Sequence, residues 1–591
     1  MNVSPLVVVA GTVAAVLAVL AALPWTRRLD YLARATPVAA ALGVAVAVAV
    51  GALGVWTGAA YVAIVTLVGT GVGVLRVGEG RAVVRRVRTR LLFGVPWGTV
   101  VVTVGVAAFY LFVQFGYRHP TSPLVVPFVS WSYFYPLGVL TAPFAHASLG
   151  HVTGNLVATV ALAPLAEYAF SHFPTSRGSS AFDSWRTNPY VRAIVLFPLG
   201  VFAVALLTGV FSWGATIGFS GVVYAFAGFA LVRFPLATVL AVSAREVVSL
   251  LWSVVRDPIT FASASPSFGP PWWAGIAVQG HLFGFLVGAV LAAVLVVRRD
   301  NRPSAARIWF GAVVLASSLS LWAVWWYGTV DEYVLYRAVG VLLVASLAVL
   351  LTVAVRADDR TLVSDVSTRK LAFAVLALPI VTMCVVAVPV NLTTVSDADL
   401  PGDPVEIRGY EVTYAEDVTN ERVAGVDLPY FAQATNVSAS GVIVANERRQ
   451  IWTEEVSAGR LGFYGDQSVR VGGVGWMESV GVHRRGWVPA GGSAVYNVYV
   501  TPPEGETRHV YASESSTADP TIAGRTVRVD AADGGFGLEV LRNGSVLESV
   551  QIPGKNETAT AGGLTFVRNG SRVLAEYGNT TVRVASKETY E

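Results

Sequence analysis

The sequence predicts a mainly α-helical, polytopic membrane bundle followed by one or two all-β modules at the C-terminus. Hydrophobic residues make up 54% of the 591 residues and charged residues only 14%, and the mean hydropathy is +0.59. This composition excludes a soluble enzyme and a disordered chain. From about Val405 onward, apolar and polar residues alternate with period two, as in Val-Tyr-Asn-Val-Tyr-Val at 495–500, which is typical of β-strands.

Twelve apolar stretches are long enough to cross a bilayer, which takes about 17–25 residues in a helix. The stretch at 219–233 is short, as expected for a helix that begins below the outer surface at a water-filled cavity. The division of 37–76 into two spans sets the parity of every later span. The predicted spans lie near 5–25, 37–56, 59–76, 91–115, 150–170, 191–211, 219–233, 235–255, 273–297, 308–327, 333–355 and 371–391.

Basic residues predict the orientation in the membrane. The apolar run Leu6–Leu23 is followed, not preceded, by Arg27 and Arg28, which favours a retained helix with its N-terminus outside over a cleaved signal peptide. The loops predicted to be extracellular before the tail hold little positive charge beyond Arg118 and Arg256. The predicted cytoplasmic loops are basic, with Arg27, Arg28 and Arg34; Arg81, Arg85, Arg86, Arg88 and Arg90; Arg177 and Arg186; Arg298, Arg299, Arg302 and Arg307; and Arg356, Arg360, Arg369 and Lys370.

The C-terminal tail has the composition of an exported segment. From Asn391 onward there are 17 basic and 26 acidic residues, whereas the rest of the chain has 25 and 12. The only cysteine, Cys384, lies in an apolar span, so the tail folds without a disulfide. We therefore expect a multi-pass protein of the cell membrane with an extracellular C-terminal domain. Its Asn-X-Ser/Thr sequons are at Asn391, Asn436, Asn543, Asn556, Asn569 and Asn579.

Polar residues in the middle spans mark a candidate site, because a histidine inside a bilayer is costly and usually functional. His151 and Asn155 are four residues apart, so both hydrogen-bond donors project from one helix face. Ser220 stands between glycines in 218–221 at the head of an apolar helix, where backbone N–H groups and the helix dipole favour a developing oxyanion. His281 begins another span and is the residue type that activates such a serine.

The residues around His281 indicate how the two helices meet. Gly284 and Gly288 share the face of His281, and Gly221 begins a similar strip of small residues beside Ser220. Small residues allow close approach of helix backbones in lipid. Tyr224 points to the same side as Ser220, and we expect it to pack on the imidazole of His281. The span of His281 has no carboxylate, which favours a Ser–His dyad over a triad.

Three segments together resemble the signatures of the rhomboid intramembrane serine proteases: HASLGHVTGN at 146–155, GFSGVVY at 218–224 and GHLFGFLVG at 280–288. They occur in the order of that family, and the resemblance covers roughly 91–297. It implies a six-helix core with these motifs on its second, fourth and sixth helices.

The resemblance also implies roles for individual residues. Ser220 is expected to be the nucleophile and His281 the general base. His151, Asn155 and the backbone N–H of Ser220 are expected to form the oxyanion hole, with Tyr224 packing on His281.

Further positions are expected to support the site or the fold. His146 is expected to position a loop, Gly218 belongs to the serine motif, and Glu167 matches a structural acidic position of some family members. The chain departs from the family in two respects. The loop 116–147 lacks the Trp-Arg pair that many members have, and position 280 is glycine where alanine is common.

These observations predict four parts of the chain. Residues 1–90 are expected to form three transmembrane helices and a basic cytoplasmic loop, and 91–297 the rhomboid protease core. Residues 298–391 are expected to add three transmembrane helices, and 392–591 an extracellular β-sandwich-like domain.

The predicted function is an intramembrane serine endopeptidase that hydrolyses peptide bonds in or near transmembrane segments of membrane proteins. The alternative is a catalytically silent rhomboid-like protein that binds clients through its outer domain. A transporter is less consistent, because the sequence has no convincing internal repeat.

Other chemistries lack their residues. No His-Glu-X-X-His motif and no aspartate within the core spans is present, which argues against metallo- and aspartyl proteases. A metal site made of His146, His151 and His281 would lack supporting carboxylates. We therefore expect no metal and no cofactor. The expected partners are the lipid bilayer and membrane-protein substrates, not nucleic acid, and the sequence gives no oligomeric state.

Overall fold

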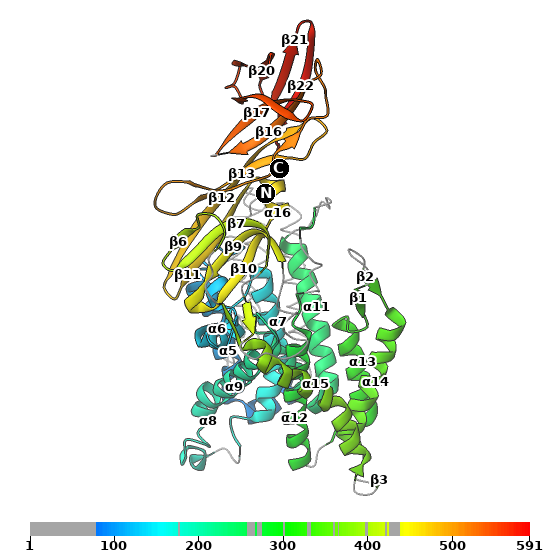
Figure 1. Cartoon of the computed structure of the whole chain (residues 1–591). Coiled ribbons are helices and arrows are strands. Elements are labelled where there is room, and N and C mark those ends of the chain that lie inside the picture. Colours follow the sequence, from blue (N-terminus) through cyan, green and yellow to red (C-terminus); the bar gives the residue numbers. More distant parts are fainter. Residues whose placement is uncertain are drawn as a thin grey trace, which may run out of the picture.

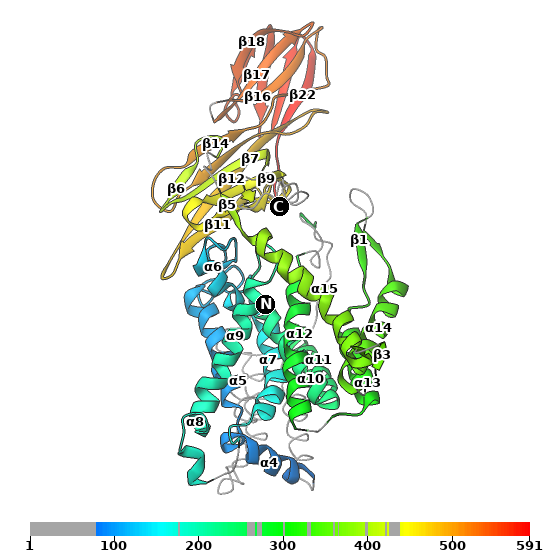
Figure 2. The same cartoon turned by 60° about the horizontal axis from the view of Figure 1, so that its bottom comes forward.

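The computed structural model describes residues 79–174, 178–256, 266–268, 275–299, 302–327, 333–357, 361–363, 366–395, 400–419, 422–424, 438–532 and 534–591. The spans predicted near 5–25, 37–56 and 59–76 lie outside the described residues. Helices form one bundle, and the β-strands of the C-terminal part lie beyond one end of it (Figures 1 and 2).

Five helical segments of the described chain are long and apolar enough to cross a membrane. Three shorter apolar segments, Trp97–Val113, Ser220–Arg233 and Ala305–Ser318, accompany them. The chain is therefore a multi-pass membrane protein. The long segments are α7 (Leu149–Phe170), Pro189–Val210, α12 (Val278–Arg298), α14 (Arg337–Arg356) and α15 (Thr368–Asn391).

The remaining helices complete the bundle. Trp97–Val113 consists of α5 (Trp97–Ala108) and a π-helical turn, and Pro189–Val210 ends with α9 (Phe197–Val210). α11 (Pro235–Arg256) carries Arg245 and Glu246 and is not among the apolar candidates to span the membrane. The others are α4 (Glu79–Arg90), α6 (Pro136–Thr141), α10 (Ser220–Arg233) and α13 (Ala305–Ser318).

Two of the predicted spans are wrong in extent. The stretch 308–327 contains α13, which ends at Ser318, and then strand β1 (Trp325–Tyr327). β1 pairs antiparallel with β2 (Tyr333–Leu335), which occupies the start of the stretch predicted at 333–355. Aromatic and β-branched residues favour extended backbone, and apolar content alone does not distinguish such a hairpin from the end of a helix.

α10 and α12 approach each other closely because glycines line their contact. A Cβ atom at Gly284 would overlap the carbonyl oxygen of Gly221, and one at Gly288 would overlap that of Ala225. Gly228 of α10 likewise lies against the carbonyl oxygen of Phe285. Backbone contact of this kind drives helix association in lipid, where apolar side chains gain little by leaving one apolar environment for another. The contact places the N-terminal ends of both helices side by side.

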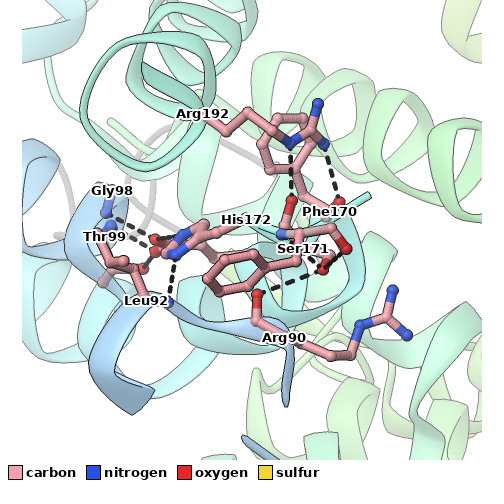
Figure 3. Close-up of polar contacts among 10 residues, drawn as sticks. Arg90, Leu92, Gly98, Thr99, Phe170, Ser171, His172 and Arg192 are labelled. Atoms are coloured by element: carbon pink, nitrogen blue, oxygen red, sulfur yellow. Dashed lines mark hydrogen bonds and ion pairs between the residues drawn. The ribbon is translucent and has the colours of Figure 1, made fainter. Parts of the chain in front are cut away.

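Glu167 joins α7 to the start of α5. The carboxylate is fully buried and accepts hydrogen bonds from the N–H groups of Gly98 and Thr99, each at 2.7 Å, and from the Thr99 hydroxyl at 2.7 Å. His172 accepts from the Leu92 N–H at Nδ1 (2.8 Å) and donates to Glu167 from Nε2 (2.7 Å). Figure 3 shows this cluster. An acceptor at these N–H groups caps α5, whose own N-cap residue is a proline without a side-chain acceptor.

Three arginines cap the C-terminus of α7, the negative end of the helix dipole. Arg90 and Arg299 donate to the carbonyl of Ala169, at 3.4 and 2.9 Å. Arg192 donates to the carbonyls of Ser171 and Phe170, at 3.0 and 3.2 Å (Figure 3). Cationic donors at a helix C-terminus satisfy its free carbonyls and its dipole. This end of α7 faces away from the β-strands (Figure 1).

In its described residues, the C-terminal part is β-structure apart from the short helix α16 (Ala458–Tyr464) and a 3₁₀ turn at Glu447–Arg449. One antiparallel sheet has the order β10-β9-β7-β6, and an eight-stranded sheet includes β14-β13-β12-β22-β21-β20-β19 with β11 beside β12. A third has the order β15-β16-β17-β18. The strands are β6 (Val405–Ile407), β7 (Tyr410–Thr419), β9 (Ser438–Asn446), β10 (Ile451–Ser457), β11 (Asp466–Gly473), β12 (Trp476–Pro489), β13 (Val495–Thr501), β14 (Arg508–Ala512), β15 (Ser516–Thr517), β16 (Thr526–Ala532), β17 (Gly535–Arg542), β18 (Ser545–Gln551), β19 (Thr558–Ala561), β20 (Leu564–Asn569), β21 (Arg572–Tyr577) and β22 (Thr580–Lys587).

Short strand pairs complete the described β-structure. β3 (Thr361–Val363) pairs with β4 (Val366–Ser367), and β5 (Thr393–Val395) pairs with β8 (Arg422–Ala424). Asn543 and Gly544 form the turn between β17 and β18, and both have positive φ, at 51° and 80°.

Three hydrophobic clusters lie among these sheets, and one of them, the near core, also includes residues of the helical part of the chain. Val126, Val129, Trp131 and Tyr135, from the loop between α5 and α7, pack with valines and tyrosines of the β-sheets. The far core is formed by β-strand residues and their connections, such as Val529, Leu538 and Phe566. The near part of the β-domain is therefore built around a loop of the helical bundle.

We predict that Glu167→Gln lowers the free energy of unfolding by about 2–3 kcal/mol, because an amide nitrogen would face N–H donors and leave a buried group unsatisfied. Denaturant unfolding of the full chain in detergent micelles measures the change. The control is Glu246→Gln, since Glu246 is 57% exposed and lies 3.5 Å from Arg245. It should change stability by less than about 0.5 kcal/mol. Equal losses in the two variants would contradict the capping role of Glu167.

Candidate active site

Ser220 and His281 touch. Ser220 is the first residue of α10, and His281 lies in the first turn of α12. The Ser220 Oγ and His281 Nε2 atoms are 2.7 Å apart, a normal hydrogen-bond distance between the two helices. If His281 accepts the hydroxyl proton, its own proton resides on Nδ1. The geometry is that of a nucleophile paired with a general base.

Tyr224 sets the position of the imidazole ring. The Tyr224 ring stacks on His281 with centroids 4.4 Å apart and planes 10° from parallel. One turn of α10 separates Tyr224 from Ser220, so one helix face supplies both the hydroxyl and the stacking ring. Gly280 has no room for a side chain, because a Cβ there would overlap the Ser212 hydroxyl. The serine explains why glycine stands at 280 in this chain.

His151 and Asn155 lie beside Gly218, two residues before Ser220. Ser148 caps α7 by accepting the His151 N–H at 3.2 Å, which fixes the helix start. A Cβ at Gly218 would lie 2.7 Å from His151 Nε2 and 3.8 Å from Asn155 Nδ2. Gly218 also has φ of +115°, a conformation that favours glycine. The space left by this missing side chain is thus bordered by two nitrogen atoms.

Both nitrogen atoms are suited to donate. His151 Nδ1 accepts the Ala147 N–H at 3.4 Å, which leaves the proton on Nε2, the nitrogen that faces Gly218. Asn155 is 8% exposed, and its Nδ2 is one of the buried polar atoms that lack a partner among the described residues. A buried unpaired amide costs stability and calls for an explanation. The backbone N–H groups at the start of α10 have no side-chain cap from Phe219.

His146 packs against His151. Its ring contacts His151 edge-to-face with centroids 4.9 Å apart. Nδ1 lies 3.1 Å from the Phe144 carbonyl, and Nε2 accepts the Phe219 N–H at 3.4 Å. The side chain therefore bridges the loop before α7 and the residue before Ser220. It does not touch the Ser220 hydroxyl.

A partly open hollow of about 330 Å³ adjoins the Ser220–His281 pair and includes open solvent. Ser220, Gly218 and His281 line it together with the loop that precedes α10. Small and polar residues form its remaining wall, namely Ala142, Pro143, Thr208, Gly209, Ser212, Thr216, Ile217, Gly221, Ala277 and Gly280. Water can approach the hydroxyl from this side. Within the described ranges, no group of three or more His, Cys, Asp or Glu residues fits a metal ion.

Several polar residues near the site were not singled out from the sequence. Gln114 accepts the His146 N–H at 2.8 Å and donates to the carbonyls of Leu124 and His146, at 2.8 and 3.0 Å. Gln279 accepts the Trp213 N–H at 3.2 Å. The only available signal was that both are amides in apolar spans, which the cost of burial makes unusual.

The comparison with protein families agrees with the motifs. The family model described as the Rhomboid domain matches residues 130–298. No curated protein matches the chain, and no solved structure does either. The matched range begins after the first of the six predicted core helices and contains all three motifs, from His146 to Gly288. This chain therefore carries a rhomboid domain, which extends over residues 130–298.

Proposed function

We propose that this protein is an intramembrane serine protease that hydrolyses peptide bonds in or next to transmembrane segments of other membrane proteins. The observation that carries the proposal is the 2.7 Å contact between Ser220 Oγ and His281 Nε2 beside a hollow that opens to solvent. Most rhomboid proteins are serine proteases of this kind, although some are inactive, so the family alone leaves both readings open.

The proposed reaction proceeds through an acyl-enzyme. Ser220 Oγ attacks the carbonyl carbon of the scissile bond while His281 Nε2 takes the hydroxyl proton. His281 then gives this proton to the leaving amine as the C–N bond breaks. Water attacks the resulting ester, again losing a proton to His281, and the second product leaves with Ser220 restored.

The oxyanion of each tetrahedral intermediate would lie near Gly218. His151 Nε2 and Asn155 Nδ2 border that space, and the Ser220 N–H lies at the positive end of the α10 dipole. The unpaired Asn155 amide supports this assignment, because an oxyanion would supply its missing acceptor. Donors held in place before the reaction need no reorganisation when charge develops.

We also propose that the hollow opens to the extracellular side of the cell membrane and that the β-domain lies on that side. Arg90, Arg192 and Arg299 gather at the α7 C-terminus, away from the β-domain. Cytoplasmic ends of membrane helices carry such an excess of arginine. The exposed sequons of the β-domain, such as Asn543 and Asn579, fit an extracellular position.

The competing function is that of a silent binder that presents clients through its β-domain. A protein without catalysis has no need for a histidine held by a stacked tyrosine against a serine. It also gains nothing from an unpaired buried amide. Both features favour the protease.

We predict that Ser220→Ala abolishes cleavage of a reporter transmembrane substrate and labelling by a fluorophosphonate probe, because it removes the hydroxyl that is hydrogen-bonded to His281. The control Ser253→Ala changes an exposed residue of α11 and should leave both signals intact. Purified protein reconstituted in lipid vesicles is the material for both assays. Wild-type protein that neither cleaves nor reacts, although folded, would support the silent binder instead.

We predict that Asn155→Leu separates catalysis from stability. The change removes a buried amide that has no partner in the described structure, so stability should be equal or higher. Loss of one oxyanion donor should lower kcat by about 10²–10³-fold. Cleavage kinetics and thermal unfolding of the same sample test the two effects. A large loss of stability with unchanged kcat per folded molecule would contradict the role of Asn155.

A further inference from the structure

Asn391, the last residue of α15, is buried against the loops of the candidate active site. Only 3% of the residue is exposed. Oδ1 accepts the Gly214 N–H at 2.8 Å, and Nδ2 donates to the Ser212 carbonyl at 2.6 Å and the Tyr133 hydroxyl at 3.4 Å. All three partners belong to the rhomboid domain at 130–298. The asparagine therefore binds another part of the chain through its side chain.

The backbone at Asn391 joins a second loop. The Asn391 carbonyl accepts the Tyr133 N–H at 3.0 Å and the Ser132 hydroxyl at 3.3 Å. Ser132 also donates to the Thr393 carbonyl at 2.5 Å, at the start of β5. One residue thus connects two loops of the rhomboid domain at the point where the β-domain begins.

The loop that Asn391 holds is the wall of the hollow and leads directly into Ser220. Ser212 and Thr216 line the hollow. The hydroxyls of Ser130 and Thr216 are hydrogen-bonded to each other at 3.0 Å. Two residues later, the Gly218 N–H donates to the Ala142 carbonyl at 2.9 Å. A shift of Ser212 and Gly214 would therefore reach the backbone that places Ser220.

α15 also reaches the helix of His281. Trp213 Nε1 donates to the Met383 carbonyl at 2.7 Å, and Gln279 Nε2 donates to Cys384 Sγ at 3.1 Å. Gln279 stands two residues before His281. The last two turns of α15 consequently contact the segments that carry both members of the Ser220–His281 pair.

We propose that Asn391 is a positioning residue for catalysis, and that it makes the seating of the β-domain a condition for an aligned Ser220–His281 pair. The proposal rests on the proposed protease function. It also gives Asn391-Leu392-Thr393 a meaning other than the sequon predicted from the sequence. A side chain with three hydrogen bonds in a buried site is not available for a glycan in the folded protein.

The test compares Asn391→Ala with a matched control, Asn497→Ala, in the full chain. Asn497 is also fully buried, donates to the Gly535 carbonyl at 2.9 Å and accepts from His509 at 2.7 Å, but it lies in the β-domain away from the loops. The measurements are the rate constant of fluorophosphonate labelling, kcat and KM for a reporter transmembrane substrate, and thermal unfolding. Rates are taken at a temperature where each variant is folded.

Asn391→Ala should lower kcat and the labelling rate constant by at least about tenfold with KM nearly unchanged, since small misplacements of reacting groups slow catalysis strongly. Asn497→Ala should lose thermal stability but keep its rates per folded molecule. Tyr133→Phe removes the hydroxyl that accepts from Asn391 Nδ2 and that also donates to the Val210 carbonyl. It keeps the other Asn391 hydrogen bonds, so it should give a smaller loss of about threefold, and it serves if Asn391→Ala does not fold. Wild-type rates in folded Asn391→Ala, or in folded Tyr133→Phe if the alanine variant is unusable, would overturn the proposal and leave the protease function standing. Wild-type protein without labelling or cleavage would instead remove the protease function itself.

Discussion

Direct backbone contact between α10 and α12 is the constraint on which the site depends. In lipid, apolar side chains gain little free energy when two helices associate, so helix packing depends on how closely the backbones approach. Gly284 and Gly288 meet the carbonyls of Gly221 and Ala225 without intervening side chains. Only at this separation does an imidazole in the first turn of α12 reach a hydroxyl on the first residue of α10. The glycines therefore contribute to the chemistry through distance alone.

Polar side chains inside the bundle divide into two kinds. Glu167 is fully buried, and its two oxygens accept from Gly98, Thr99 and His172, so its charge is satisfied within the fold. Asn155 is buried near Gly218, two residues before Ser220, with an amide nitrogen that has no partner among the described residues. A membrane interior makes either condition expensive unless something compensates. For Glu167 the compensation is structural, whereas for Asn155 it would come only when a reacting group develops negative charge.

Sequence patterns predicted what is local and missed what is distant. His151 and Asn155, or Ser220 and Tyr224, are paired by helical spacing, and the three motifs led to the rhomboid domain that the family model confirms. The spacing contained no information on Asn391, whose partner Ser212 is 179 residues away and whose local pattern is that of a sequon. The sequence predicts helix where β1 and β2 form a hairpin, because apolar aromatic residues fit either pattern. The three N-terminal spans stay a prediction.

The near core of the β-domain limits how that domain can move. Val126 and Val129 come from a loop of the helical bundle, yet they are 2% and 6% exposed within a core made mostly of β-strand residues. Burying one such side chain is worth about 1.5–3 kcal/mol, so withdrawing the loop would expose several such contributions at once. Phe268, which lies between α11 and α12, adds ring contacts to Phe463 and Tyr464 of α16. A domain attached at these points cannot swing freely on a linker. Its near part is therefore fixed against the helical bundle, whereas the far core packs β-domain residues only with one another.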